Sequence, residues 1–128
     1  MANFAATLRE DMLKWALNIG TIPTRPTVFY VSFHTADPEG TGANETSYLT
    51  RTLHNSWDAG TTGDGIVENT GAGETASATG AATITHFGVW SAATNGTFYF
   101  GGALTESKII ALNDKLSWAD AALTAILS

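Results

Sequence analysis

The 128-residue chain is long enough for one domain with a modest core, and it contains no cysteine, which excludes disulfides and thiolate metal sites. Twelve acidic against six basic residues give a net charge of −6, so the chain repels phosphate backbones and is not expected to bind nucleic acid. No apolar run reaches the roughly 18 residues of a membrane span, and the first residues lack the pattern of a signal peptide. We therefore expect no membrane partner, and a product that is made and kept in a cytoplasm or leaves it by lysis or in a particle.

The chain begins with a predicted helix at residues 4–18, within an N-terminal segment of residues 1–20. Asn3 can cap its start, Gly20 can take the left-handed position after its end, and Pro23 bars continuation. Its apolar residues fall at helical spacing: Leu8, Met12, Leu13, Trp15, Ala16, Leu17 and Ile19. This apolar stripe either covers a flank of a sheet or docks onto a neighbouring subunit, with Met12 and Trp15 as the candidate contact residues.

An extended linker with two prolines leads to a predicted strand at residues 28–34. Aromatic and β-branched residues alternate there with a period of two, which is typical of a half-buried strand. The phenylalanines are predicted to face the core. His34 then falls on the opposite, more polar face, at the end of the strand.

The loop at residues 35–47 places Asp37 and Glu39 near His34 in sequence, so this corner is a candidate chemical site. Asp-Pro pairs start turns, and a short acidic side chain can bond the backbone of its own turn. We interpret the segment as a structural corner, in which Asp37 caps the turn and His34 bonds loop backbone.

Residues 47–57 predict the next strand, with Tyr48 and Leu49 on opposite faces. The centre of the chain, up to about residue 83, is rich in Gly, Thr and Ala. We expect short strands there near residues 66–69 and 75–78, and otherwise a long loop.

The last third carries the clearest strand pattern. Residues 83–92 and 96–104 predict two strands joined at Asn95-Gly96, because Asn-Gly is the strongest short hairpin signal. Residues 107–112 and 115–119 predict a second hairpin around Asn113-Asp114, and residues 122–127 a final strand. The fold class is therefore mainly β: a single domain over residues 1–128, an antiparallel β-sandwich (jelly-roll-like) with one N-terminal α-helix.

Patterns that carry catalysis or metal binding are missing from this sequence. His34, His54 and His86 are scattered, with no HExxH motif, and no GxSxG or phosphate-binding loop occurs. Calcium could use two acidic loops, one with Asp37, Glu39 and Glu45 and one with Asp58 and Asp64, although neither has EF-hand spacing. We expect no cofactor, no bound metal and no enzymatic activity.

Sugar recognition is the remaining ligand hypothesis. Four aromatic residues could offer a stacking surface, although one or two of them are expected in the core: Trp57, Trp90, Tyr99 and Trp118.

The order of these features resembles a family of small tailed-bacteriophage virion structural proteins of the tail-fibre, minor-tail or head-decoration type. The resemblance covers nearly the whole chain and is carried by five stretches: HTADP at 34–38, YLTR at 48–51, THFGVW at 85–90, GGAL at 101–104, and the turn before LSW at 116–118. It implies a virion structural module that is not an enzyme.

The leading hypothesis is therefore a non-enzymatic virion protein, either a tail-fibre or tail-tip component or a capsid decoration (cement) protein. It would act by packing against the tail or the major capsid protein and form a homo-oligomer, with a trimer expected by family analogy. The candidate interface residues are Met12, Trp15, Trp57 and Trp90. The alternative is a receptor-binding module that recognises host-surface glycans.

Overall fold

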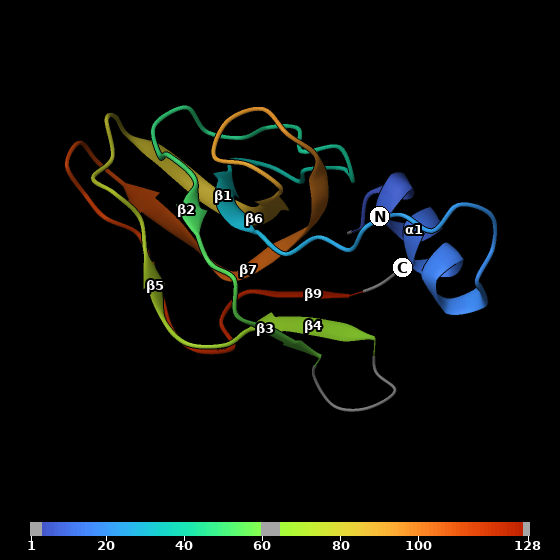
Figure 1. Cartoon of the computed structure of the whole chain (residues 1–128). Coiled ribbons are helices and arrows are strands. Elements are labelled where there is room, and N and C mark those ends of the chain that lie inside the picture. The colour runs from blue at the N-terminus through green and yellow to red at the C-terminus, as the bar shows by residue number, and fades with distance from the viewer. Residues whose placement is uncertain (1–3, 60–64, 127–128) are drawn as a thin grey trace.

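The computed structural model describes residues 4–59 and 65–126, which form one helix and nine strands (Figure 1). The helix is α1 (Ala6–Leu17). The strands are β1 (Tyr30–His34), β2 (Thr52–Leu53), β3 (Trp57–Ala59), β4 (Ile66–Asn69), β5 (Gly73–Glu74), β6 (Ala82–Trp90), β7 (Phe98–Ile110), β8 (Ser117–Trp118) and β9 (Thr124–Ile126).

All strand pairs in the described residues are antiparallel, and they form three sheets. The largest has the order β2-β1-β6-β7, a second has β3-β4-β9, and a third has β5-β8. The second sheet lies below the first in Figure 1, with β9 under β7. The two backbones come so close that a Cβ on Gly102 would lie 2.4 Å from the Thr124 carbonyl oxygen. The mainly β, sandwich-like fold with one N-terminal helix is thus confirmed.

The core lies between these layers and is dominated by aromatic and β-branched side chains. Its most deeply buried apolar members are Val31, Phe33, Ile84, Phe87, Val89 and Leu123. Aromatic rings connect the sheets: Trp57 contacts Phe87 and Phe100, and Phe33 contacts Trp118 at 5.5 Å between ring centroids. Burial of such rings is the main favourable contribution to folding in a domain of this size.

The hairpin predicted around Asn95-Gly96 is confirmed by the pairing of β6 with β7. The connection spans residues 91–97, a longer loop than a two-residue turn, and within it Asn95 and Gly96 both have positive φ, 55° and 79°. The predicted strand at residues 66–69 is also confirmed, as β4.

The predicted second hairpin is wrong in its pairing. Residues 107–110 continue β7 along β6, and β8 pairs with β5, so that Trp118 lies opposite Gly73. The turn itself is present: Asn113 has a φ of 72°, and the Asp114 amide donates to the Ala111 carbonyl at 3.0 Å. The chain leaves the first sheet at this turn, and β8 pairs with β5 in a separate sheet.

Two further strand predictions need correction. Within residues 47–57 only β2 and the first residue of β3 are strand, because Leu49 turns into the core and Arg51 makes side-chain bonds instead of ladder bonds. The strand predicted at 75–78 occurs earlier, as β5, because Thr75 and Ala78 bond single backbone groups outside any ladder.

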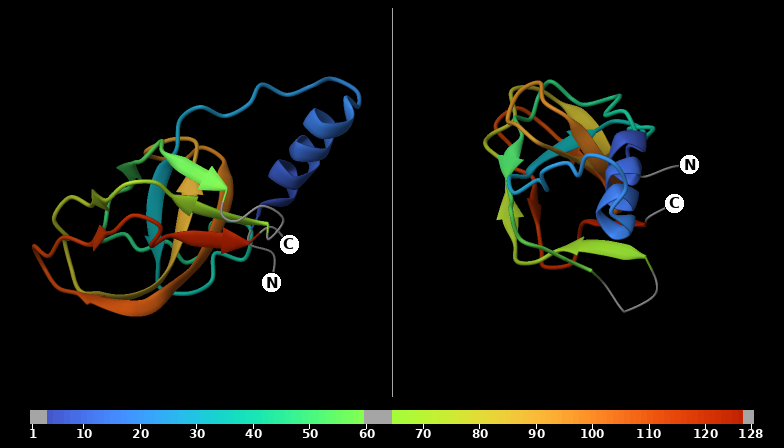
Figure 2. Two further views of the ribbon diagram at one scale, coloured as in Figure 1. Left: turned by 90° about the horizontal axis from the view of Figure 1, so that it is seen from below. Right: turned by 45° about the vertical axis from the view of Figure 1, so that its right-hand side comes forward.

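Helix α1 is shorter than the predicted 4–18 and differs at both ends. Asn3 lies outside the described residues, and the first cap is Ala5, without a side-chain bond. Asn18, with a φ of 54°, takes the left-handed cap predicted for Gly20. The described helix is not long and apolar enough to cross a membrane. In Figure 2 α1 stands beside the sheets at the end of a long linker.

Candidate functional site

The corner around His34 is the first candidate site, and the structure places it inside the protein. His34 is fully buried, not on an exposed polar face as predicted, because residues 43–46 cover that face of β1. Its Nδ1 lies 2.7 Å from the Ala43 carbonyl oxygen and its Nε2 2.7 Å from Ser32 Oγ. Trp90 Nε1 in turn donates to Ser32 Oγ at 2.9 Å.

This chain of bonds has one consistent set of donors. A carbonyl only accepts, so Nδ1 carries the proton, Nε2 accepts from the Ser32 hydroxyl, and that hydroxyl accepts from the indole of Trp90. Burial lowers the pKa of His34 below its ordinary value of 6.5, and the bond to Ala43 only partly opposes that shift. A Ser–His contact can serve nucleophilic catalysis, but Ser32 is 1% exposed, so the pair is sealed from substrates and acts as a structural link.

Asp37 and Glu39 form the corner that the sequence predicts. The Glu39 amide donates to Asp37 Oδ1 at 2.7 Å, and Asn44 Nδ2 donates to the Asp37 carbonyl at 2.8 Å. Both polar ends of Asp37 are therefore used to hold the loop, and His34 bonds that loop from the strand.

The metal candidates do not converge within residues 4–59 and 65–126, where no group of three His, Asp or Glu side chains is placed to hold an ion. His86 lies opposite His34 on the neighbouring strand, whereas His54 packs against Trp57 and Trp118. Asp64, one of the two acidic residues in the second loop considered for calcium, lies outside the described residues.

Arg51 organises a site that the sequence reasoning missed. Its guanidinium makes a two-pronged ion pair with Glu45, at 2.8 and 2.9 Å, and donates to the carbonyls of Ala92 and Asn95. It also lies 3.8 Å from the centroid of the Trp90 ring. One feature of the sequence could have pointed to this site. Arg51 is the one Lys or Arg between Arg25 and Lys108, so the acidic residues of this stretch have no other strongly basic partner nearby in sequence.

The four candidate sugar-stacking rings are separated in the fold. Trp118 is 5% exposed, and the half-buried Trp57 contacts core rings and donates to the His54 carbonyl. Trp90 is covered by Arg51, and Tyr99 contacts Phe29 edge-on. The four rings thus make mainly intramolecular contacts.

The N-terminal part of the chain exposes several large apolar side chains. We call residues 6–28, α1 and its linker, the arm, and residues 29–126 the β-body. Five apolar side chains of the arm are between 42% and 63% exposed: Leu13, Leu17, Ile19, Ile22 and Val28. An apolar patch of this kind marks an interaction surface in a soluble protein.

The helix of the arm has two apolar faces. Leu8 and Met12 pack half-buried against the core of the β-body, whereas Leu13 and Leu17, one turn apart, face away from it. Trp15 lies on the inner side and donates its Nε1 proton to the Pro23 carbonyl at 2.7 Å, which ties the linker to the helix. Of the two predicted contact residues on the helix, Met12 packs against the core and Trp15 holds the arm together.

The base of the arm is fixed to the β-body. The Phe4 ring stacks on Phe100 with 5.1 Å between centroids, and the Ala5 amide donates to the Tyr99 carbonyl at 2.7 Å. The arm therefore leaves the body from a defined point on β7.

A groove on the β-body lies between the second half of β7 and the segment from β8 to β9. Its volume is about 240 Å³. The lining residues are Leu104, Thr105, Glu106, Lys108, Leu116, Ser117, Trp118, Ala119, Ala122 and Leu123. Leu116, Trp118 and Leu123 are buried and form an apolar floor. The indole Nε1 of Trp118 has no hydrogen-bond partner among the described residues.

Comparison with known families gives one match of nearly full length. A family model described as "Podophage GP4 fiber I protein gp80" matches residues 3–126. No curated protein matches the sequence.

Proposed function

Because this chain belongs to the podophage GP4 fiber I protein family, we propose that it is a tail-fibre component of a podophage virion that works by packing against other virion proteins. The resemblance to virion structural proteins noted in the sequence is confirmed by this family. A virion structural role follows from the family; the place on the tail, the packing mechanism and the homo-oligomer are the proposal.

The observation that carries the proposal is the exposed apolar face of the arm. A helix with apolar residues on two faces is stable when both are covered, and the β-body covers only the side of Leu8 and Met12. Leu13 and Leu17 are 59% and 63% exposed, so a partner surface is needed to cover them. Such a helix face laid into an apolar groove is a common mode of protein recognition.

The predicted interface residues divide into two groups under this proposal. Met12 and Trp15 support the arm, so that its outer face is presented at a fixed angle. Trp57 and Trp90 support the β-body through their ring and indole bonds, and both side chains are only partly buried.

The alternative, a module that recognises host-surface glycans, has weaker support from the geometry. Sugar stacking needs an exposed aromatic face, and Arg51 already lies over Trp90 while Trp118 is buried. A glycan array tests this alternative: binding of a defined sugar by the purified protein at micromolar concentration would favour it over packing.

The location is tested by negative-stain imaging of particles with a gold-labelled antibody against the chain. Label at the tail is the expected result. A regular pattern of label over the head would contradict the tail-fibre proposal and favour capsid decoration. Unlabelled particles would contradict a virion role.

A further inference from the structure

We infer that the first described segment of this chain, residues 4–17, is exchanged between copies, so that the segment of one copy occupies the corresponding place on β7 of a second copy. This inference rests on the proposed packing function and names a second copy of the chain as the partner of the arm.

The structure shows the contacts of an exchanged segment, because the segment makes them within one chain. The Phe4 ring stacks on Phe100 at 5.1 Å between centroids, and the Ala5 amide donates to the Tyr99 carbonyl at 2.7 Å. We call this position on β7, at Tyr99 and Phe100, the docking site. An element exchanged between identical copies keeps all of its contacts, so exchange is a low-cost route to an oligomer.

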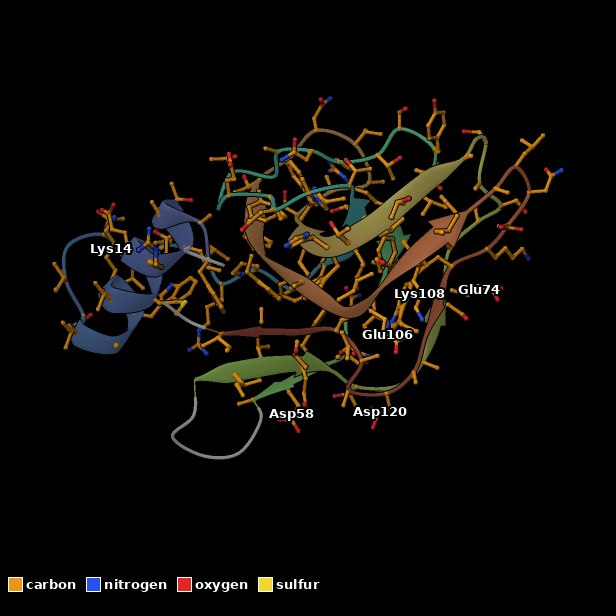
Figure 3. The ribbon with its side chains drawn as sticks, turned by 180° about the vertical axis from the view of Figure 1, so that it is seen from behind. Lys14, Asp58, Glu74, Glu106, Lys108 and Asp120 are labelled. Atoms are coloured by element: carbon orange, nitrogen blue, oxygen red, sulfur yellow. The ribbon has the colours of Figure 1, made fainter. Side chains whose placement is uncertain are left out.

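The linker that follows the segment makes few bonds to the rest of the chain. Residues 18–29 separate the end of α1 from the start of β1. Every hydrogen bond that residues 18–28 make with described residues stays within the arm, and none of these residues packs against the core. Figures 2 and 3 show α1, marked by Lys14 in Figure 3, to one side of the sheets. Among the described residues, moving the segment to another copy therefore costs no hydrogen bond between the linker and the β-body.

The linker is long enough to reach a neighbouring copy. It contains Pro23 and Pro26, which favour extended backbone, and its twelve residues span about 37 Å when extended at about 3.1 Å per residue. A domain of this length has a radius of gyration of about 14 Å. The linker therefore reaches beyond its own β-body once the turn at Gly20 opens. A Cβ on Gly20 would meet no described residue within 4 Å apart from its chain neighbours, so packing does not hold that turn closed.

The apolar side chains of the linker supply the reason for exchange. A segment docks on its own chain at an effective concentration around millimolar, so a second copy is favoured only where exchange adds contacts. Linkers are expected to be polar, but Ile19 is 52% exposed, and Ile22 and Val28 are each 42% exposed. Leu17, at the end of the helix, is 63% exposed. In a reciprocal exchange the two linkers run past each other between the bodies, which removes this apolar surface from water.

The test introduces cysteines, because the chain has none of its own. Phe4 lies opposite Phe100 in antiparallel register, which places Ala5 opposite Tyr99. Opposed residues in such a pair are about 5.5 Å apart between Cα atoms, within the range that a disulfide bridges. Full-length Ala5→Cys and Tyr99→Cys chains are mixed, unfolded in urea, refolded together at increasing concentration and oxidised with copper phenanthroline. Circular dichroism checks that each variant is folded.

The expected result on a non-reducing gel is a covalent dimer with one chain of each kind, whose fraction rises with protein concentration. Each single variant alone gives no such band, because its docking contact contains only one thiol. The matched control is Ala5→Cys/Tyr99→Cys in one chain at low concentration, where the closed monomer forms the bond within itself. That internal bond, together with no cross-linked dimer in the mixture at any concentration, would overturn the inference.

Two changes in the arm move the exchange in opposite directions. Leu17→Gln/Ile22→Gln removes apolar contacts between the linkers, and we expect the cross-linked fraction to fall at least about tenfold. Trp15→Phe removes the indole donor that holds the linker folded back along the helix, and we expect the fraction to rise. The matched control is Thr21→Gln/Thr24→Gln, at exposed polar positions of the linker, which leaves the fraction unchanged. Equal fractions for all three variants would overturn the inference, because the linker would then have no part in association.

Particle labelling separates this inference from the proposed function. Label at the tail, together with a mixture that never cross-links, would overturn the exchange and leave the fibre role standing. Cross-linking in the mixture without label on the particle would support the exchange and contradict the fibre role.

Discussion

Leu123 and Leu17 are residues of the same type in two different regions of this molecule. Leu123 is 1% exposed on the floor of the β-body, where its amide also bonds Asn69 Oδ1 at 2.8 Å. Leu17 is 63% exposed at the end of α1. The floor of the β-body is covered by its own chain, whereas the outer face of the arm is exposed. The comparison separates residues that stabilise the fold from residues that are available to a partner.

The largest expected effect comes from truncating the buried member of this pair. Leu123→Ala removes three side-chain carbons, one methine and two methyls, from the core and leaves a cavity, and we expect it to lower the free energy of unfolding by about 3 kcal/mol. Urea denaturation followed by tryptophan fluorescence measures this. A loss below about 1 kcal/mol would mean that the floor of the groove is loosely packed and that the two regions differ less than the structure indicates.

Arg51 gives the next largest effect, because it connects three parts of the β-body. Its side chain is 8% exposed, and removal in Arg51→Ala leaves Glu45 and the carbonyls of the 92–95 loop without their donor. We expect a loss of about 2 kcal/mol in the free energy of unfolding.

The matched control for this change is Arg51→Lys, which keeps the charge but cannot form the two-pronged bond to Glu45. We expect the free energy of unfolding of Arg51→Lys to lie between those of the natural chain and Arg51→Ala. Equal stability of Arg51→Lys and the natural chain would show that charge alone, and not the geometry of the guanidinium, holds the loop at Asn95.

Local signals in the sequence predicted the parts of the fold that depend on neighbours along the chain. The Asn95-Gly96 turn and the alternation on either side of it gave the β6–β7 hairpin, and β4 matched its predicted bounds. These elements are specified by turn chemistry and by the period of two.

Pairings between distant segments were not predictable in the same way. Trp118 lies opposite Gly73, 45 residues earlier, and the match depends on a glycine whose Cβ would collide with the indole ring at 2.2 Å. His34 was expected on a polar face, but the loop that follows it folds back and covers it. The alternation of apolar and polar residues indicates that a strand has two faces. It does not indicate whether a loop covers the more polar face.

The buried histidine predicts a dependence of stability on pH. The pKa of His34 is lowered in the folded state by burial, so below pH 6.5 the unfolded chain binds a proton that the folded chain does not. Its contribution to stability is full above pH 6.5 and decreases as the pH falls below that value. The neighbouring charges of Glu45, Arg51 and His86 modulate this shift without reversing it.

This prediction is measured by urea denaturation at several values between pH 7.5 and pH 5. The control is His34→Asn, whose amide can still donate to the Ala43 carbonyl but does not titrate. We expect a flatter pH profile for the variant than for the natural chain. Identical slopes would show that the imidazole titrates normally and that the site at Ser32 is more accessible than its burial indicates.

The smallest expected effect on folding comes from the exposed member of the leucine pair. Leu17→Ala removes a side chain that no described residue of the β-body covers, and alanine favours helix as well as leucine does. We therefore expect the free energy of unfolding to change by less than about 0.5 kcal/mol. A loss as large as that of Leu123→Ala, measured on dilute monomer, would mean that the arm folds onto the body of its own chain. Unchanged monomer stability together with weaker self-association would instead assign the apolar face of the arm to a partner.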